Sequence, residues 1–235
     1  APWEIEEMGP VEGKSLLHMQ CHIGTDTLSW AHEGAQVTGL DFSPNAIAEA
    51  ARFADILGFD DARFVVSRVS EAVETLEGEQ FDIIYTGRGA LCWLPDLKEW
   101  ARVCAALLRQ GGTLYFEEST PMVNILDSEE GPNGSRLVPK YDLFNEGPIS
   151  EIGEGSYADP EWPGRGVTHC WEYRYDTIIN ALIEGGFRIE FLNERDELFF
   201  TPWPEFFDSS RPNYWRLKEG NVSLPLSFTL KATRL

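Results

Sequence analysis

The feature that most constrains the fold is a regular alternation, between residues 15 and 117, of short apolar runs with amphipathic helical stretches. This alternation is typical of a parallel β-sheet whose strands are joined by crossover helices. The predicted strands cover residues 15–19, 36–41, 62–66, 81–86 and 113–117, and the predicted helices cover residues 25–32, 44–57, 70–76 and 96–108. Ser43 is expected to cap the helix that begins at Pro44, and Gly58 and Gly111-Gly112 are expected to end helices.

The chain continues with a predicted helix over residues 176–184, a strand over 187–193 and a last strand over 223–233. We therefore expect an α/β three-layer sandwich on an open, mainly parallel seven-stranded sheet whose last strand is antiparallel. Residues 1–235 are expected to form a single domain with insertions at about 119–168 and 195–220. Both insertions follow strands that end on the carboxyl edge of the sheet, so both can roof a crevice there.

The charge balance argues against nucleic acid as a partner. The chain has 39 acidic and 19 basic residues, a net charge of −20 and a pI near 4.5, and would repel the phosphates of nucleic acid. The acids are spread over the whole chain, which is typical of a solvated acidic surface. Adaptation of the host to salt would give the same pattern.

The sequence also predicts a cytoplasmic protein without a membrane partner. No apolar stretch reaches the ~20 residues of a membrane-spanning helix, and the first residues lack the pattern of a signal peptide. Because the first residue is not Met, a preceding segment that is absent here stays an open alternative. The cysteines form no C-x-x-C pair and have no metal-ligand spacing with histidines, so we predict free thiols, no metal site, and a core position for Cys104.

The turn after the first strand is the most informative segment for function. A buried strand runs into a tight turn, a helix opens at that turn, and Asp41 ends the second strand 17 residues after Gly24. In sites of the dinucleotide type, such a turn brings the backbone close to the ligand while a carboxylate accepts both ribose hydroxyls. Asp41 is therefore predicted to bind a ribose. The alternative is a cap on the helix that begins at Pro44, a role that Ser43 already fills.

This segment resembles the class I, Rossmann-like methyltransferases, and in particular a bacterial group whose first loop reads L-H-x-Q-C-H-x-G-x-D-T. The general family has D/E-x-G-x-G-x-G. Here His18 stands at the acidic position, Gln20 and His22 replace the first two glycines, and Gly24 remains. The resemblance extends over residues 13–233. It implies S-adenosylmethionine as the cofactor and S-adenosylhomocysteine as the product.

The resemblance also implies which residues meet the cofactor. Gln20 and Cys21 should line the methionine portion, which Gly24 would allow to lie near the turn. Asp26 should meet the ammonium group, directly or through water, unless it only favours the helix dipole. The predicted cofactor-binding residues are Gln20, Cys21, Gly24, Asp26, Asp41, Phe42, Ser43, Ser67, Arg68, Val69, Thr86 and Gly87.

Two arginines leave alternatives open. Arg68 stands where the family has an acid, and it cannot accept the hydrogen bond that an adenine amine offers. Either Ser67 or a main-chain carbonyl accepts that bond, or Arg68 points to solvent and pairs with an acid such as Glu71. Arg88 follows the fourth strand and either holds a substrate carboxylate or phosphate, or pairs with an acid of the protein.

Methyl transfer is an in-line displacement, so the protein mainly aligns the reactants and, for oxygen or nitrogen acceptors, supplies a base. Glu117, Glu118 and His169 are candidate bases, with packing among aromatic residues as the alternative for His169. An aromatic run over residues 198–207 either closes the pocket, which we favour, or lines an apolar substrate cavity or forms a dimer contact. The predicted catalytic residues are Glu117 and His169, and the predicted substrate-binding residues are Arg88, Trp93, Trp171 and Trp203.

We therefore predict S-adenosylmethionine-dependent methyl transfer to oxygen or nitrogen of a small molecule, with a homodimer left open. A nicotinamide-dependent oxidoreductase is one alternative, disfavoured by the missing G-x-G-x-x-G and the predicted antiparallel last strand. A protein of the same fold that binds the cofactor without turnover is another, suggested by Arg68 and by the lack of an obvious base. Members of the resembling group carry further residues ahead of residue 1, which would form a helical lid.

Overall fold

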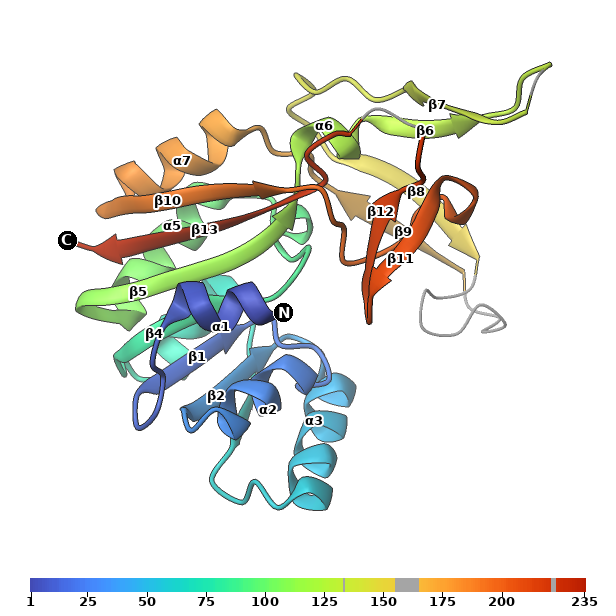
Figure 1. Cartoon of the computed structure of the whole chain (residues 1–235). Coiled ribbons are helices and arrows are strands. Elements are labelled where there is room, and N and C mark those ends of the chain that lie inside the picture. The colour runs from blue at the N-terminus through green and yellow to red at the C-terminus, as the bar shows by residue number, and fades with distance from the viewer. Residues whose placement is uncertain (133, 155–164, 221–222) are drawn as a thin grey trace.

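A seven-stranded sheet forms the centre of the computed structural model, which describes residues 1–132, 134–154, 165–220 and 223–235 (Figure 1). In order across the sheet, the strands are β10 (Phe187–Arg195), β13 (Ser227–Arg234), β5 (Leu108–Ser119), β4 (Phe81–Thr86), β1 (Ser15–Met19), β2 (Gln36–Asp41) and β3 (Arg63–Val66). β1 to β5 pair in parallel, whereas β13 is antiparallel to both β5 and β10. The predicted fold class and the antiparallel last strand are confirmed.

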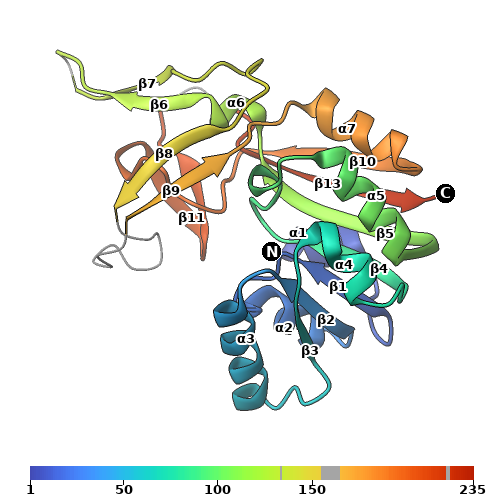
Figure 2. The same cartoon turned by 180° about the vertical axis from the view of Figure 1, so that it is seen from behind.

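Helices cover both faces of the sheet and complete the three layers (Figures 1 and 2). One face carries α1 (Pro2–Met8), α2 (Thr25–His32) and α3 (Pro44–Leu57), and the other carries α4 (Ala72–Thr75), α5 (Leu97–Leu107) and α7 (Tyr175–Glu184). Short 3₁₀ turns, η1 (Val69–Glu71) and η2 (Leu91–Trp93), precede α4 and α5. As predicted, Ser43 caps α3 by accepting from Ala46 N at 3.3 Å, and Gly58 ends it with a φ of 75°.

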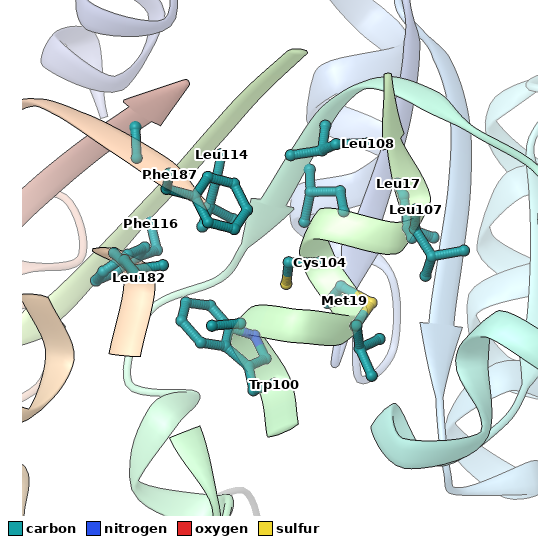
Figure 3. Close-up of a cluster of buried hydrophobic side chains, with 14 of the residues drawn as sticks. Leu17, Met19, Trp100, Cys104, Leu107, Leu108, Leu114, Phe116, Leu182 and Phe187 are labelled. Carbon is teal, nitrogen blue, oxygen red and sulfur yellow. The ribbon is translucent and has the colours of Figure 1, made fainter. Parts of the chain in front are cut away.

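Successive side chains of the central strands point to opposite faces, so the sheet separates two cores. Leu16 belongs to a cluster with Trp30 of α2, while Leu17 belongs to the cluster on the α5 side. In the cluster on the α5 side, Trp100 and Cys104 of α5 lie among side chains of the strands and Leu182 of α7 (Figure 3). Cys104 is fully buried, which confirms its predicted core position.

Gly111 and Gly112 do not end the fourth helix, and this prediction is wrong. α5 ends at Leu107 and β5 begins at the next residue. The glycines instead lie where the register of β5 shifts, because pairing advances from residue 81 to 83 on β4 while it advances from 108 to 113 on β5. A Cβ on Gly112 would lie 2.8 Å from the carbonyl oxygen of Arg109, which explains glycine at this position.

Other differences concern element ends. The predicted helix over 70–76 is divided into η1 and α4. The last strand begins at Ser227 instead of residue 223, because Pro225 has no N–H to donate to a neighbouring strand. α1 was not predicted from the sequence. No helix within the described ranges is long and apolar enough to cross a membrane.

The two predicted insertions form hairpins beyond the carboxyl edge of the sheet (Figures 1 and 2). The first contains α6 (Pro121–Asn124), the pair β6 (Leu126–Glu129) and β7 (Arg136–Pro139), and the pair β8 (Ile149–Glu154) and β9 (Arg165–Cys170). Residues 133 and 155–164 of this segment lie outside the described residues. The second contains η3 (Pro204–Phe206), β11 (Phe207–Arg211) and β12 (Tyr214–Leu217). That residues 1–235 form one domain stays a prediction.

Candidate functional site

A cavity of about 880 Å³ lies at the carboxyl ends of β1, β2 and β4, within the size range of small-molecule sites. It brings together the predicted residues Gln20, Cys21, Asp26, Asp41, Phe42, Ser43, Ser67, Arg68, Val69, Gly87, Arg88 and Trp93. It is also lined by residues that the sequence analysis did not assign to a site, which are His18, His22, Thr25, Leu40, Ser70, Gly89, Ala90, Leu94, Pro95, Asp96, Glu99 and Trp100. The sequence motifs were sufficient to predict the segments that follow the strands. They could not predict that the first residues of α5 also line the cavity.

The turn after β1 keeps the backbone conformation of a glycine loop, although two of the three glycines are replaced. Gln20, His22 and Gly24 have φ angles of 56°, 50° and 76°. These are the three positions at which the general family has glycine, and a left-handed conformation costs a residue with a Cβ roughly 1–2 kcal/mol. The backbone therefore approaches the cavity as a glycine loop does, while two side chains add polar groups to its wall.

Asp41 holds this turn in place. Its Oδ2 accepts from the backbone N–H of His22 at 2.9 Å, and its Oδ1 accepts from the N–H of Ser43 at 2.9 Å. The side chain thus braces the ends of β1 and β2 against each other, and Ser43 alone caps α3. Asp41 is buried yet lies on the cavity wall, and each of its oxygens has a further lone pair for a ligand hydroxyl.

Gly24 has a packing role that the resemblance did not indicate. It does not line the cavity, and a Cβ on it would lie 2.8 Å from both Ala50 of α3 and the ring of Phe64. A Cβ on Gly39 of β2 would lie 2.7 Å from the same ring. Both glycines therefore allow α3 and β3 to pack closely behind the turn. Thr86 is likewise behind the wall and is fully buried.

Two residues of the cavity wall each have a buried polar atom that lacks a partner within the described part of the chain, and these atoms are His18 Nε2 and Gln20 Oε1. His18 uses its other nitrogen in a 2.7 Å hydrogen bond with Thr27, and burial lowers its pKa to about 4, so the ring is neutral. Gln20 donates its amide N–H to the carbonyl of Ala90 at 2.9 Å. Unsatisfied buried groups cost free energy, and the ammonium and carboxylate of an amino acid would satisfy them. These residues fit the amino-acid end of S-adenosylmethionine.

The opposite end of the cavity has an exposed rim. Phe42 is 71% exposed directly after Asp41, and its ring is available to stack on a base. Arg68 is exposed and makes no ion pair with Glu71 within the residues described. Ser67 is buried, and its hydroxyl lies 2.9 Å from the hydroxyl of Thr75 and donates to the carbonyl of Arg68 at 3.0 Å. Its remaining lone pair can accept a hydrogen bond from an amine.

Arg88 lies on the cavity wall but is committed to acids of the protein. Its guanidinium pairs with Glu4 of α1, with Asp26 of α2 at 3.4 Å and with Glu117 of β5 at 3.2 Å. Arg88 thus pairs with acids of the protein, which is the second of the two roles that the sequence left open. A role in binding a substrate anion stays a prediction, and it would require Arg88 to exchange one of these carboxylates.

The two acids at the end of β5 are buried and carry raised pKa values. Burial and the nearby Glu4 raise the pKa of Glu117 to about 7, against the hydrogen bond from Tyr214 and the charge of Arg88. Burial raises the pKa of Glu118 to about 8, although Glu118 accepts from the N–H groups of Ala90 and Leu91 at 2.8 Å each. Neither acid lines the cavity. Glu118 instead supports the wall segment that follows β4.

Three further predicted residues are not among those that line the cavity. His169 is exposed on β9, where its Nδ1 is 2.8 Å from the hydroxyl of Ser150. Trp171 continues from β9, and Trp203 donates to Asp127 at 3.2 Å. None of residues 198–207, which were predicted to close the pocket, lines the cavity, although the ring of Phe199 lies beside Gly89 of its wall. This aromatic run contributes to a separate apolar cluster whose buried members are Val123, Leu198, Phe207 and Leu226. No group of metal-ligating side chains occurs in the described parts of the chain.

Residues 17–114 match the family model of a methyltransferase domain. A 117-residue stretch, 48% of this chain, is 34% identical to 46% of the ubiquinone biosynthesis O-methyltransferase of Bordetella pertussis. The chain therefore spans about half the length of the curated relatives it matches. Residues 17–114 include β2 to β4, part of β1 and every residue that lines the cavity, whereas the insertions lie beyond them.

Solved structures resemble the chain over nearly its full length. A proposed S-adenosylmethionine-dependent methyltransferase of Listeria monocytogenes covers 99% of this chain and 97% of its own, with a TM-score of 0.72 and 18% identity. An S-adenosylmethionine-dependent methyltransferase of Mesorhizobium loti covers 99% and 96%, with a TM-score of 0.65 and 21% identity. At these identities the similarity establishes a shared fold.

Proposed function

We propose that this protein transfers a methyl group from S-adenosylmethionine to oxygen or nitrogen of a small molecule. The observation that carries the proposal is the left-handed turn at residues 20–24, which Asp41 braces beside a cavity whose lining residues His18 and Gln20 have unsatisfied buried polar atoms. The match of residues 17–114 to a methyltransferase domain supports it. The first loop further supports a place in the bacterial group with L-H-x-Q-C-H-x-G.

The residues of this chain would bind and align the cofactor. Asp41 would accept the ribose hydroxyls, Phe42 would stack on the adenine, and Ser67 would accept its amine. His18 and Gln20 would meet the amino-acid end. The cofactor supplies a methyl group that its sulfonium has already activated, so alignment carries most of the catalysis. A base role for Glu117 or His169 stays a prediction.

The acceptor is less constrained than the cofactor. The relative from Bordetella pertussis is named as an O-methyltransferase, which supports oxygen. The matched stretch is only 48% of this chain, however, so both oxygen and nitrogen are retained in the proposal. The small-molecule class is supported by the acidic surface, which disfavours nucleic acid. A homodimer and a cytoplasmic location stay predictions.

Isothermal titration calorimetry with S-adenosylhomocysteine and, separately, with NADH tests the cofactor. We expect binding of S-adenosylhomocysteine alone, and binding of NADH alone would contradict the proposal. Incubation of the full chain with S-adenosylmethionine labelled in its methyl group and with extracts of small metabolites then tests turnover. A chain that binds the cofactor yet transfers no label to any fraction would favour the non-catalytic alternative.

A further inference from the structure

Two cysteines meet at the junction between the cavity wall and the first insertion. Cys92 lies in η2, between residues Ala90 and Trp93 of the cavity wall, and Cys170 ends β9. The N–H of Trp171 donates to the carbonyl of Cys92 at 2.9 Å, so the two segments lie side by side. The thiol of Cys92 donates to the carbonyl of Gly89 at 3.4 Å, and the sulfur of Cys170 is also within its hydrogen-bonding reach. The junction therefore brings two thiols close together from segments that are far apart in sequence.

The two thiols have different reactivity. The hydrogen bond from Cys92 lowers the pKa of Cys170, against its burial and the charges of Glu172 and Glu151. The same bond, burial and the carboxylates of Glu118 and Glu172 raise the pKa of Cys92. Both cysteines are only partly buried. An accessible thiol with a lowered pKa beside a second thiol is the arrangement that oxidants attack selectively.

The other two cysteines lack this arrangement. Cys21 and Cys104 are both buried. Burial raises the pKa of Cys21 to about 12, and burial likewise raises the pKa of Cys104. Any oxidation of the folded chain should therefore start at the Cys92–Cys170 pair.

We propose that Cys92 and Cys170 form a reversible disulfide that fastens the first insertion to the cavity wall and slows ligand exchange. The oxidant is a small disulfide of the glutathione class. The Cys170 thiolate attacks one of its sulfurs, the sulfur–sulfur bond breaks, and one glutathione leaves. Cys92, once deprotonated, attacks Cys170 and expels the second glutathione. The two cysteines lose two electrons, and the two protons end on the two glutathione thiols.

The wall segment that Cys92 belongs to explains the effect on exchange. Residues 87–90 and 93–96 of this segment line the cavity. Gln20 and Glu118 hold the segment at Ala90, and Glu118 also accepts from Leu91. A covalent bond at Cys92 adds a fixed point on the side that faces the insertion. The effect on ligand exchange rests on the proposed function, whereas formation of the bond does not.

The test uses the full chain, reduced and then equilibrated in glutathione buffers of increasing oxidised fraction. Free thiols are blocked, and peptides are mapped by mass spectrometry. We expect a peptide pair joined through Cys92 and Cys170, reversal by a reductant, and a higher melting temperature for the oxidised chain. The rate of S-adenosylhomocysteine dissociation, measured by stopped flow, should fall several-fold on oxidation. Cys170→Ser should lose both effects, and Cys104→Ala, as the matched control, should keep them.

Distinct outcomes separate the two proposals. Glutathione adducts without the joined peptide, or joined peptides that involve Cys21 as often as Cys92, would overturn the disulfide. A joined peptide with an unchanged dissociation rate would overturn the effect on exchange. If S-adenosylhomocysteine binds neither form, the proposed cofactor fails, while the joined peptide still decides whether the disulfide exists.

Discussion

The carboxylate of Asp41 accepts a hydrogen bond from the backbone N–H of His22 at 2.9 Å and thereby joins the ends of β1 and β2. His22 is held in the left-handed region with a φ of 50°. One side chain at the end of one strand thus keeps the turn after another in the conformation that shapes the cavity. Ligand binding and the stability of this turn should therefore depend on the same carboxylate.

Replacing Asp41 with Asn tests this dependence. The amide keeps one acceptor but turns a donor toward His22 or Ser43, so a backbone N–H loses its partner, at a cost of about 1–3 kcal/mol in unfolding free energy. Affinity for S-adenosylhomocysteine should fall at least tenfold, because the charged acceptor for the ribose is lost. Urea unfolding and calorimetry measure the two effects. Unchanged affinity in a folded variant would remove Asp41 from the site.

Gly24 and Gly39 form a matched pair for a stability test. Gly39→Ala would meet the ring of Phe64 and should cost about 1–3 kcal/mol by overpacking. Gly24→Ala meets the same ring and also has a φ of 76°, which adds roughly 1–2 kcal/mol of backbone strain. Urea unfolding should therefore rank Gly24→Ala as the less stable variant. Equal losses would mean that the turn relaxes around the new Cβ.

The raised pKa of Glu118 predicts how the free energy of unfolding depends on pH. Its pKa is about 8 in the folded chain against an ordinary value of 4.5, so the unfolded chain releases this proton first. The free energy of unfolding should then fall as the pH rises from about 4.5 to about 8. Glu118→Gln keeps an acceptor for Ala90 and Leu91 but cannot ionise. The free energy of unfolding of the variant should therefore fall less steeply between these pH values. Equal slopes for both proteins would contradict the prediction.

Arg88 should be more important for stability than a surface arginine. Arg88→Met leaves the fully buried Glu117 without its cation, which should lower the free energy of unfolding by about 3–5 kcal/mol. The matched control is Arg52→Met, because its partner Glu49 is exposed, and little change is expected there. Hydrogen exchange over residues 2–8 should also increase, since Arg88 holds Glu4 of α1. Equal losses in both variants would contradict this role.

Periodicity was sufficient to predict the sheet. β1, β2 and β4 match their predicted bounds because each is a buried run that ends at a turn signal. It failed at Gly111-Gly112, since a glycine pair after a helix can end that helix or lie in an irregular part of the strand that follows. Only the pairing of β4 with β5 distinguishes the two.

The site was predictable where it depends on local chain order and not where it depends on distant contacts. Asp41 and the turn at residues 20–24 follow from the strand–turn–helix pattern. The ion pairs of Arg88 with Glu4 and Glu117 could not be predicted, because Glu4 lies 84 residues before Arg88 and Glu117 lies 29 residues after it. The exposed position of His169 on β9 could not be predicted either, because the residue type indicates a possible base but not where the chain places it.

The interior place of β13, between β10 and β5, sets an order of assembly during synthesis. Every residue of the cavity wall is translated by position 100, whereas the strand that links β10 to the sheet is translated only at residues 227–234. A nascent chain that has reached Glu118, which supports the wall at Ala90 and Leu91, therefore contains the complete pocket while about half of the polypeptide is still missing. Cofactor present in the cell at that moment would stabilise the first half before its partner strands exist.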